Sequence, residues 1–150
     1  MRAAYGDSSS PIARLRLIDS LAQRRRCEPT TIDFLRWLSS AADLGTRAAA
    51  IDALSRLDPD AAPVIAAMAG EPLLLSNVAR ALERLQDERS FAVLAQIATA
   101  SEASGSARYL AARALGRCGS PAAVPYLRQI ERTDDANVSQ LAASALAARR

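Results

Sequence analysis

The residues that could do chemistry are few, and their spacing favours no catalytic centre. The chain contains no histidine, which excludes imidazole acid–base catalysis, Ser-His and Cys-His nucleophile pairs, and nearly every zinc site. The two cysteines, Cys27 and Cys118, have no metal-type spacing. The sequence also lacks a glycine-rich phosphate loop. We therefore expect a protein that is not an enzyme and that holds neither a metal nor a cofactor.

Two pairs of adjacent carboxylates, Asp87-Glu88 and Asp134-Asp135, are the remaining candidates for acid–base work. Each pair falls in a short polar segment between two apolar segments, where a turn is expected. An aspartate in such a turn accepts hydrogen bonds from the first free N–H groups of the next helix. We interpret both pairs as helix caps.

The composition is that of a compact helical protein. Of 150 residues, 50% are hydrophobic and 23% are charged, while only 4% are aromatic, and the abundant alanine and leucine favour closely packed helices. We expect one domain over residues 11–150 after a flexible segment over residues 1–10. No apolar run reaches the ~20 residues of a membrane helix, and the N-terminal residues lack the apolar core of a signal peptide. These observations predict a cytoplasmic protein without a membrane partner.

An apolar pattern recurs roughly every 30 residues, which indicates a repeat architecture. Each unit has an Ala-Leu step, a short polar turn and a second apolar segment, and within a segment the apolar residues recur at the spacing of one helix face. The first helices of the repeats are expected near 11–26, 44–57, 73–86, 105–118 and 136–149. The second helices are expected near 30–40, 61–69, 89–100 and 121–132. Ser10 and Ser120, each followed by proline, are expected to cap the helices that follow.

Residues 107–130, ARYLAARALGRCGSPAAVPYLRQI, resemble the HEAT-like repeats of bacterial proteins, including the short type related to phycobilin lyase subunits. The likeness lies in an Ala-Leu-Gly-Arg helix end, a turn with glycine and proline, and a Val-Pro-x-Leu helix start. Residues 46–68 and 77–97 match more loosely, with Ser55 and Glu83 in place of the helix-end glycine. The resemblance implies an all-α, right-handed α-solenoid of about four helical hairpins plus one C-terminal helix. Such repeats occur in scaffolds, nucleic-acid binders, lyase subunits and a group of DNA glycosylases.

Cys118 stands where two other repeats have leucine, at Leu57 and Leu85. We interpret it as a small buried hydrophobic residue, and the alternative is a reactive thiol. Cys27 falls in an expected turn.

In proteins of this family the second helices line the concave face, so the resemblance implies an uncharged groove, because residues 61–70 and 91–100 carry no charge. The candidate partner-binding residues are Phe34, Trp37, Val64, Val93, Gln96, Tyr126 and Gln129. Two interpretations stay open. These side chains pack between neighbouring hairpins, or part of the set, above all the Trp, Tyr and Gln residues, contacts a protein or peptide partner.

The net charge is +3, and the basic excess is concentrated in residues 1–40. The candidate anion-binding residues are a cluster, Arg24, Arg25 and Arg26, and a set at equivalent repeat positions, Arg56, Arg84 and Arg117. Stacked repeats would bring the second set into a row. The alternative is that each cation stabilises the C-terminal end of its own helix. Broad positive charge and stacking aromatics, which are typical of nucleic-acid proteins, are scarce.

The sequence therefore favours a non-catalytic scaffold or adaptor that binds a protein or peptide through its second helices. The alternatives are a nucleic-acid or phosphate-bearing partner held by arginines, and a role as accessory subunit of a lyase-like or tailoring enzyme complex. The last helix has no second helix to cover Leu141 and Leu146. We expect them to close on the 121–132 helix, and self-association through this end is the alternative.

Overall fold

The computed structural model describes residues 10–23, 28–41 and 43–149, and their regular secondary structure is entirely helical. The all-α prediction is therefore confirmed. The chain divides into two compact units, residues 1–61 and residues 62–150, which we call unit 1 and unit 2. Of the predicted flexible segment, only Ser10 is among the described residues. The Arg24–Arg26 cluster and Cys27 lie outside them.

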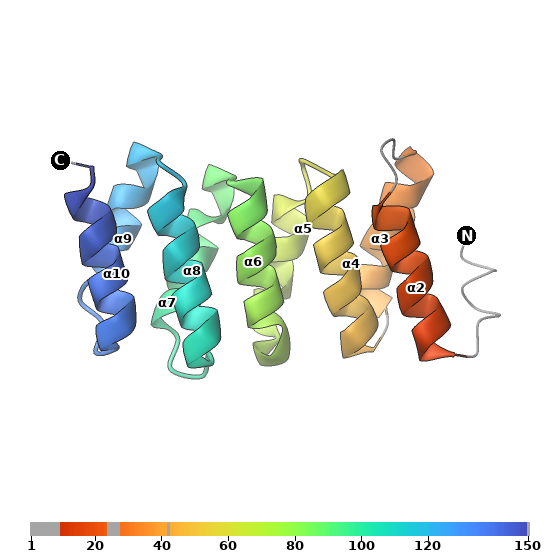
Figure 1. Cartoon of the computed structure of the whole chain (residues 1–150), viewed down its shortest axis with the longest axis horizontal. Helices are drawn as coiled ribbons and strands as arrows, with labels where there is room; N and C mark the ends of the chain where they lie inside the picture. The colour runs from red at the N-terminus through yellow and green to blue at the C-terminus, as the bar shows by residue number, and fades with distance from the viewer. Residues whose placement is uncertain (1–9, 24–27, 42, 150) are drawn as a thin grey trace. The chain divides into compact units, whose positions relative to one another are not determined.

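The described part of unit 1 contains three helices. They are α2 (Pro11–Ala22), α3 (Pro29–Ala41) and α4 (Leu44–Leu57). The last of them packs against both of the others, and α3 lies behind the layer of α2 and α4 (Figure 1). Ser10 occupies the N-cap position before Pro11, but its side chain makes no capping hydrogen bond, so that part of the prediction is wrong. In the same unit, Asp43 caps α4, because its carboxylate accepts a hydrogen bond from the N–H of Thr46 at 3.0 Å.

Unit 2 is a stack of helical hairpins. Its elements are α5 (Ala62–Ala66), η1 (Ala67–Gly70), η2 (Pro72–Leu74), α6 (Leu75–Leu85), η3 (Glu88–Ser90), α7 (Phe91–Thr99), α8 (Gly105–Arg117), η4 (Pro121–Ala123), α9 (Val124–Ile130) and α10 (Ala136–Ala147). The helices α6, α8 and α10 lie side by side in one layer, and α7 and α9 form a second layer behind them (Figure 1). Each helix contacts its neighbours in the stack, which is the arrangement of an α-solenoid. The right-handed twist stays a prediction.

Short 3-10 turns precede α6, α7 and α9, where the sequence predicts continuous α-helix. Two of these turns are tightened by a side chain at their start. Asp87 accepts a hydrogen bond from the N–H of Arg89, and Ser120 accepts one from the N–H of Ala122. Asp135 caps α10 in a similar way. The capping interpretation is therefore confirmed for Asp87 and Asp135, and Ser120 is a cap as predicted.

The apolar positions of the repeats form the core. The buried side chains come from both the first and the second helices of the repeats, among them Leu21, Leu35, Leu38, Leu54, Ile65, Leu82, Leu94, Ile97, Leu115, Leu127 and Ile130. Cys118 is half-buried, and so are the equivalent residues Leu57 and Leu85. The thiol of Cys118 lies 3.1 Å from the carbonyl oxygen of Leu115. The small-hydrophobe interpretation therefore holds only in part.

The helix α10 of unit 2 is covered by its own hairpin neighbours. The helix α10 packs against both α8 and α9, and Leu141 and Leu146 are half-buried there. Arg149 donates from Nη2 to the carbonyl oxygens of Leu115 and Gly116, each at 3.1 Å. These carbonyls belong to the last turn of α8, so a side chain from after α10 satisfies acceptors that the helix leaves free.

Candidate functional site

Three elements from the second helices of unit 2, which are α5, η1 and α7, present an uncharged surface to solvent. The exposed residues of α5, η1 and α7 are Pro63, Ala67, Gly70, Ala92 and Gln96. Val64 and Val93 are half-buried beside them. We call the exposed and half-buried residues of these three elements the uncharged face. Its small and apolar side chains can be covered by a partner without removing any ionised group from water.

Two further predicted residues lie on α9, which packs against α7. Tyr126 is half-buried, and its ring meets the buried ring of Phe91 edge to face at a centroid distance of 6.3 Å. Gln129 is exposed. Arg128 is also exposed and brings a positive charge to this helix, so α9 lies at the charged margin of the uncharged face.

The predicted aromatic pair of unit 1 has a different environment. Phe34 is only 2% exposed, so its ring belongs to the core and is not available for direct contact with a partner. Trp37 is half-buried and stacks on Phe34, with ring centroids 5.9 Å apart and planes inclined by 22°. Packing therefore accounts for Phe34, while Trp37 keeps an accessible part.

The structure brings two of the predicted anion-binding arginines together. Arg84 and Arg117 line one hollow of about 260 Å³ in unit 2, together with Arg80, Glu83 and Gln86. We call these five residues the arginine hollow. Arg56 lies in unit 1 and forms an ion pair with Asp52 at 2.6 Å, one helical turn earlier in α4.

Glu83 organises the wall of the arginine hollow. Arg113 of α8 donates to both carboxylate oxygens of Glu83, from Nε at 3.0 Å and from Nη2 at 2.7 Å. Arg117 adds a longer hydrogen bond of 3.3 Å from Nη1. The hydrogen bonds to Glu83 raise the pKa of the Arg113 guanidinium, because they stabilise its charged form.

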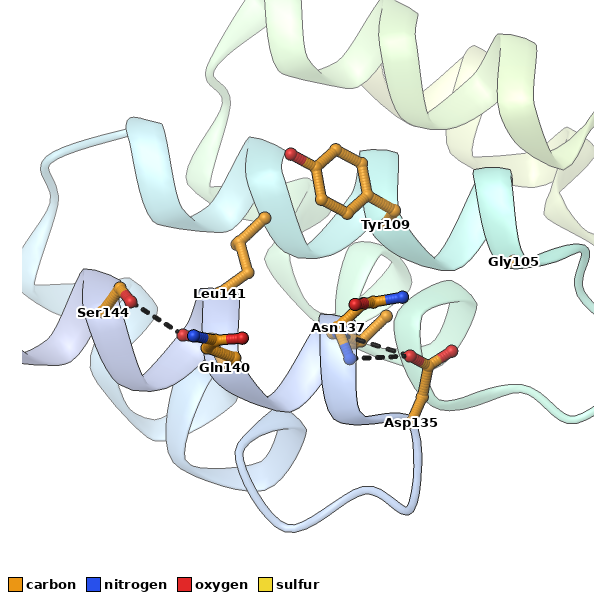
Figure 2. A pocket seen from close by; sticks show the side chains of 8 residues that line it. Gly105, Tyr109, Asp135, Asn137, Gln140, Leu141 and Ser144 are labelled. Atoms are coloured by element: carbon orange, nitrogen blue, oxygen red, sulfur yellow. Dashed lines mark hydrogen bonds between the residues drawn. The ribbon is translucent and has the colours of Figure 1, made fainter.

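A groove that the sequence does not predict lies between α8 and α10. It has a volume of about 570 Å³, and its walls include Tyr109, Asn137, Gln140, Leu141 and Ser144. Figure 2 shows Leu141 of α10 pointing toward α8, where the ring of Tyr109 lies across the groove. Tyr109 is 43% exposed. A tyrosine on a first helix can be recognised in the sequence as a candidate contact residue. Nothing in the sequence, however, places Tyr109 on the same groove as Leu141, 32 residues later.

Residues 97–150 match the family model of HEAT repeats. This part of the chain is therefore similar to HEAT repeats. The matched residues run from the end of α7 through α8, α9 and α10, so they contain Tyr126, Gln129, Arg117 and the groove of Figure 2. The match carries no subtype, and the likeness to phycobilin lyase subunits stays a prediction. No curated protein matches the chain.

Within the matched residues, the helix-end glycine has a packing role. A Cβ atom on Gly116 would lie 3.3 Å from Cβ of Ala145 and 3.6 Å from Cδ2 of Leu141, both on α10. Glycine therefore permits the close approach of α8 and α10. Glu83 occupies the equivalent position in α6, where the facing helix α8 supplies the arginines that bind its carboxylate.

No three His, Cys, Asp or Glu side chains among the described residues are grouped so that they could hold a metal ion. None of the described helices has both the length and the hydropathy that crossing a membrane requires.

Proposed function

We propose that this protein is a non-catalytic scaffold that binds a protein or peptide partner through the uncharged face of unit 2. Extended surfaces of stacked repeats are the usual binding surfaces of solenoid proteins. The HEAT-repeat match over residues 97–150 supports this class of function. The proposed contact residues, taken from the sequence analysis, are Val64, Val93, Gln96, Tyr126 and Gln129. The proposed location of the protein is the cytoplasm.

The observation that carries the proposal is the absence of charge on exposed helical positions. A surface helix normally places charged residues on its solvent side. In this chain 23% of residues are charged, yet the exposed positions of α5, η1 and α7 have none. Charged residues are depleted at the centres of protein interfaces, because removing an ion from water costs free energy that the contact must offset.

The polar residues of the surface fit the same function. The side-chain amides of Gln96 and Gln129 are exposed, and each can donate and accept hydrogen bonds. Tyr126 offers a rigid ring and a hydroxyl group at the margin of the face. Tyrosine is enriched at interfaces because it combines apolar area with a polar atom.

The proposal is tested by placing charge on the uncharged face. Ala67→Glu combined with Gln96→Glu alters two exposed positions, so the variant should fold. The matched control, Ser106→Glu combined with Ala136→Glu, adds the same charge at exposed positions in the first turns of α8 and α10. Each tagged protein is used to capture partners from a lysate of the source cells in high salt after nuclease treatment, and recovery is measured by mass spectrometry.

We expect the face variant to recover at least tenfold less of the partner protein that the unaltered chain and the control recover alike. Equal recovery by a face variant that retains the helical circular-dichroism spectrum would reject the uncharged face. Trp37→Glu tests the accessible part of unit 1 separately. An enzyme among the recovered proteins would identify the scaffold as an accessory subunit.

A further inference from the structure

A groove between α9 and α10 is a further feature of unit 2, and it shares no residue with the uncharged face or the arginine hollow. Its volume is about 550 Å³. Half of its lining is apolar, and these small or half-buried side chains come from both helices: Val124, Ala143, Leu146 and Ala147. The other half is charged and consists of Arg128, Glu131, Arg132 and Arg149. We call these eight residues the basic groove.

The charged residues of the basic groove do not neutralise one another. Arg128, Glu131 and Arg132 are exposed, and their side chains form no ion pair or hydrogen bond with any other residue that the structure describes. Arg149 is engaged, because its Nη2 donates to two carbonyl oxygens of α8, but these acceptors are neutral groups. Three guanidinium groups and one carboxylate therefore leave the groove with a net charge of +2, which two carboxylates of a ligand would balance.

Backbone and hydroxyl groups, rather than the arginines, satisfy the carbonyl end of α9. The carbonyl oxygen of Leu127 accepts from the N–H of Glu131, and that of Ile130 accepts from the N–H of Thr133. The carbonyl oxygen of Glu131 accepts from the hydroxyl of Ser139 at 2.6 Å. A cation near a helix end often serves to bind such carbonyls. That role is already filled here, so the two exposed guanidinium groups are available to a ligand.

The packing within unit 2 indicates that a helix fits the basic groove. The consecutive helices α7 and α8 pack against each other, and α9 lies against both of them. The helices α9 and α10 are also consecutive and packed together (Figure 1), so they can accept a further helix in the same way. Ion pairs already cross between helices in this unit, as Arg113 of α8 and Glu83 of α6 show.

We infer that the basic groove binds an amphipathic helix of a partner protein, which presents two carboxylates one turn apart beside an apolar residue. Arg128 and Arg132 are themselves four positions apart, so glutamates at positions i and i+4 of a helix match their spacing. A guanidinium group can bind a carboxylate through two parallel hydrogen bonds. The apolar residue of the partner would cover Leu146 and its small neighbours and remove them from water.

This chain does not supply such a helix to a second copy of itself. Each α-helix that the structure describes carries at most one aspartate or glutamate. The occupant is therefore expected to be a different protein.

A nucleic acid fits the basic groove less well than an acidic helix does. Nucleic-acid sites combine a row of phosphate contacts with aromatic rings on which bases stack. No aromatic residue lines the groove, and its apolar half has no counterpart in a phosphate backbone.

The test selects ligands from peptides of about 16 residues, long enough to form a helix, displayed on phage. Positions i, i+3, i+4 and i+7 of an alanine-rich framework are randomised, and the full chain is the bait. The peptide that is retained most strongly is synthesised, and its Kd is measured by fluorescence anisotropy. A version with a central proline, which breaks the peptide helix, and a thymidine dodecamer are the comparison ligands.

The groove variant is Arg128→Gln combined with Arg132→Gln. The matched control, Arg80→Gln combined with Arg84→Gln, removes two exposed arginines with the same spacing from α6, outside the groove. We expect acidic residues at i and i+4 of the retained peptides. The groove variant should lose about three- to tenfold in affinity, because exposed ion pairs are individually weak, and the control should lose less than twofold.

Reversing the charges gives a sharper test. Arg128→Glu combined with Arg132→Glu should weaken binding of the acidic peptide more than tenfold. A peptide with lysine at i and i+4 should restore binding to this variant to within about threefold of the original affinity, which a merely structural role of the arginines would not produce. Ala67→Glu combined with Gln96→Glu should leave the affinity unchanged, so this inference and the uncharged face can fail separately.

Six results would overturn the inference. Retained peptides without an acidic pair, or no retained peptide, would reject the charge match. Equal losses in the groove variant and the control would indicate diffuse attraction. Failure of the lysine peptide to restore binding, or undiminished binding of the proline peptide, would reject the ion pairs or the helix. A dodecamer that displaces the peptide with a lower Kd would assign the groove to a nucleic acid. Self-association that sedimentation detects in the unaltered chain but not in the reversed variant would assign it to a second copy.

Discussion

Arg113 binds Glu83 through both of its carboxylate oxygens, which ties α8 to α6 within unit 2. The side chain of Glu83 is only 14% exposed, so removal of its partner leaves a largely buried carboxylate with the weaker hydrogen bond from Arg117. Arg113→Gln should lower the free energy of unfolding by about 1–3 kcal/mol. Urea denaturation followed by far-UV circular dichroism measures the loss. Arg128→Gln is the control, and a loss no larger than the control's would show that the pair contributes nothing.

The cap of α4 should make unit 1 sensitive to pH. Hydrogen bonds from the N–H and hydroxyl groups of Thr46 hold the pKa of Asp43 below its ordinary value of 3.8. The folded state thus favours the ionised carboxylate, and the stabilisation is complete above the unfolded-state pKa. It is lost as the pH falls through the lower folded-state pKa.

Asp43→Ala should therefore cost about 1 kcal/mol at neutral pH, the usual value of an N-cap, and progressively less below about pH 4. The fluorescence of Trp37, the one tryptophan in the sequence, follows unit 1 directly. A difference between variant and unaltered protein that stays constant down to about pH 2 would contradict this account of the cap.

The contact of Gly116 with α10 should limit the size of the residue at this position. Alanine gains about 1 kcal/mol in helix propensity but sets its Cβ 3.3 Å from that of Ala145, so the two effects nearly cancel. Gly116→Val adds further atoms and should cost about 1–3 kcal/mol through overpacking. Thermal unfolding of both variants, and of Gly116→Val combined with Ala145→Gly, gives the coupling. Strictly additive losses in the double variant would exclude the close contact.

Two positions with positive φ should respond to substitution in opposite directions. Gln86→Gly should stabilise unit 2 by about 0.5–1 kcal/mol, because glycine adopts a φ of 52° without strain. Gly119→Ala should destabilise it by about 1–2 kcal/mol, since φ is 70° there while no nearby atom would oppose the new Cβ. Chemical denaturation of both variants decides this, and the same sign for both changes would reject backbone strain as the cause.

The sequence was sufficient to predict the helices because their signals are local. Apolar residues three and four positions apart define a helix face, and residues such as Asp87 and Ser120 mark the turns. The α4 and α8 bounds agree with the prediction to within one residue. The 3-10 turns were missed because they depend on the placement of single N–H groups.

The sites were harder to predict because they depend on residues about one repeat apart. Arg84 and Arg117 could be aligned from the repeat spacing, and the structure places both at one hollow. The bond between Glu83 and Arg113, and the position of Tyr109 and Leu141 on one groove, depend on the side-chain directions of two helices at once. The burial of Phe34 was also not predicted, because residues on one face of a helix differ in exposure according to which neighbouring side chains cover them.

The uncharged face should also determine how quickly a partner arrives and leaves. Because this face exerts no long-range attraction, association there should proceed at roughly 10⁵–10⁶ M⁻¹s⁻¹ and should hardly change with ionic strength. A partner would be retained there by short-range apolar contacts, so salt should alter the rate of its departure as little as the rate of its arrival.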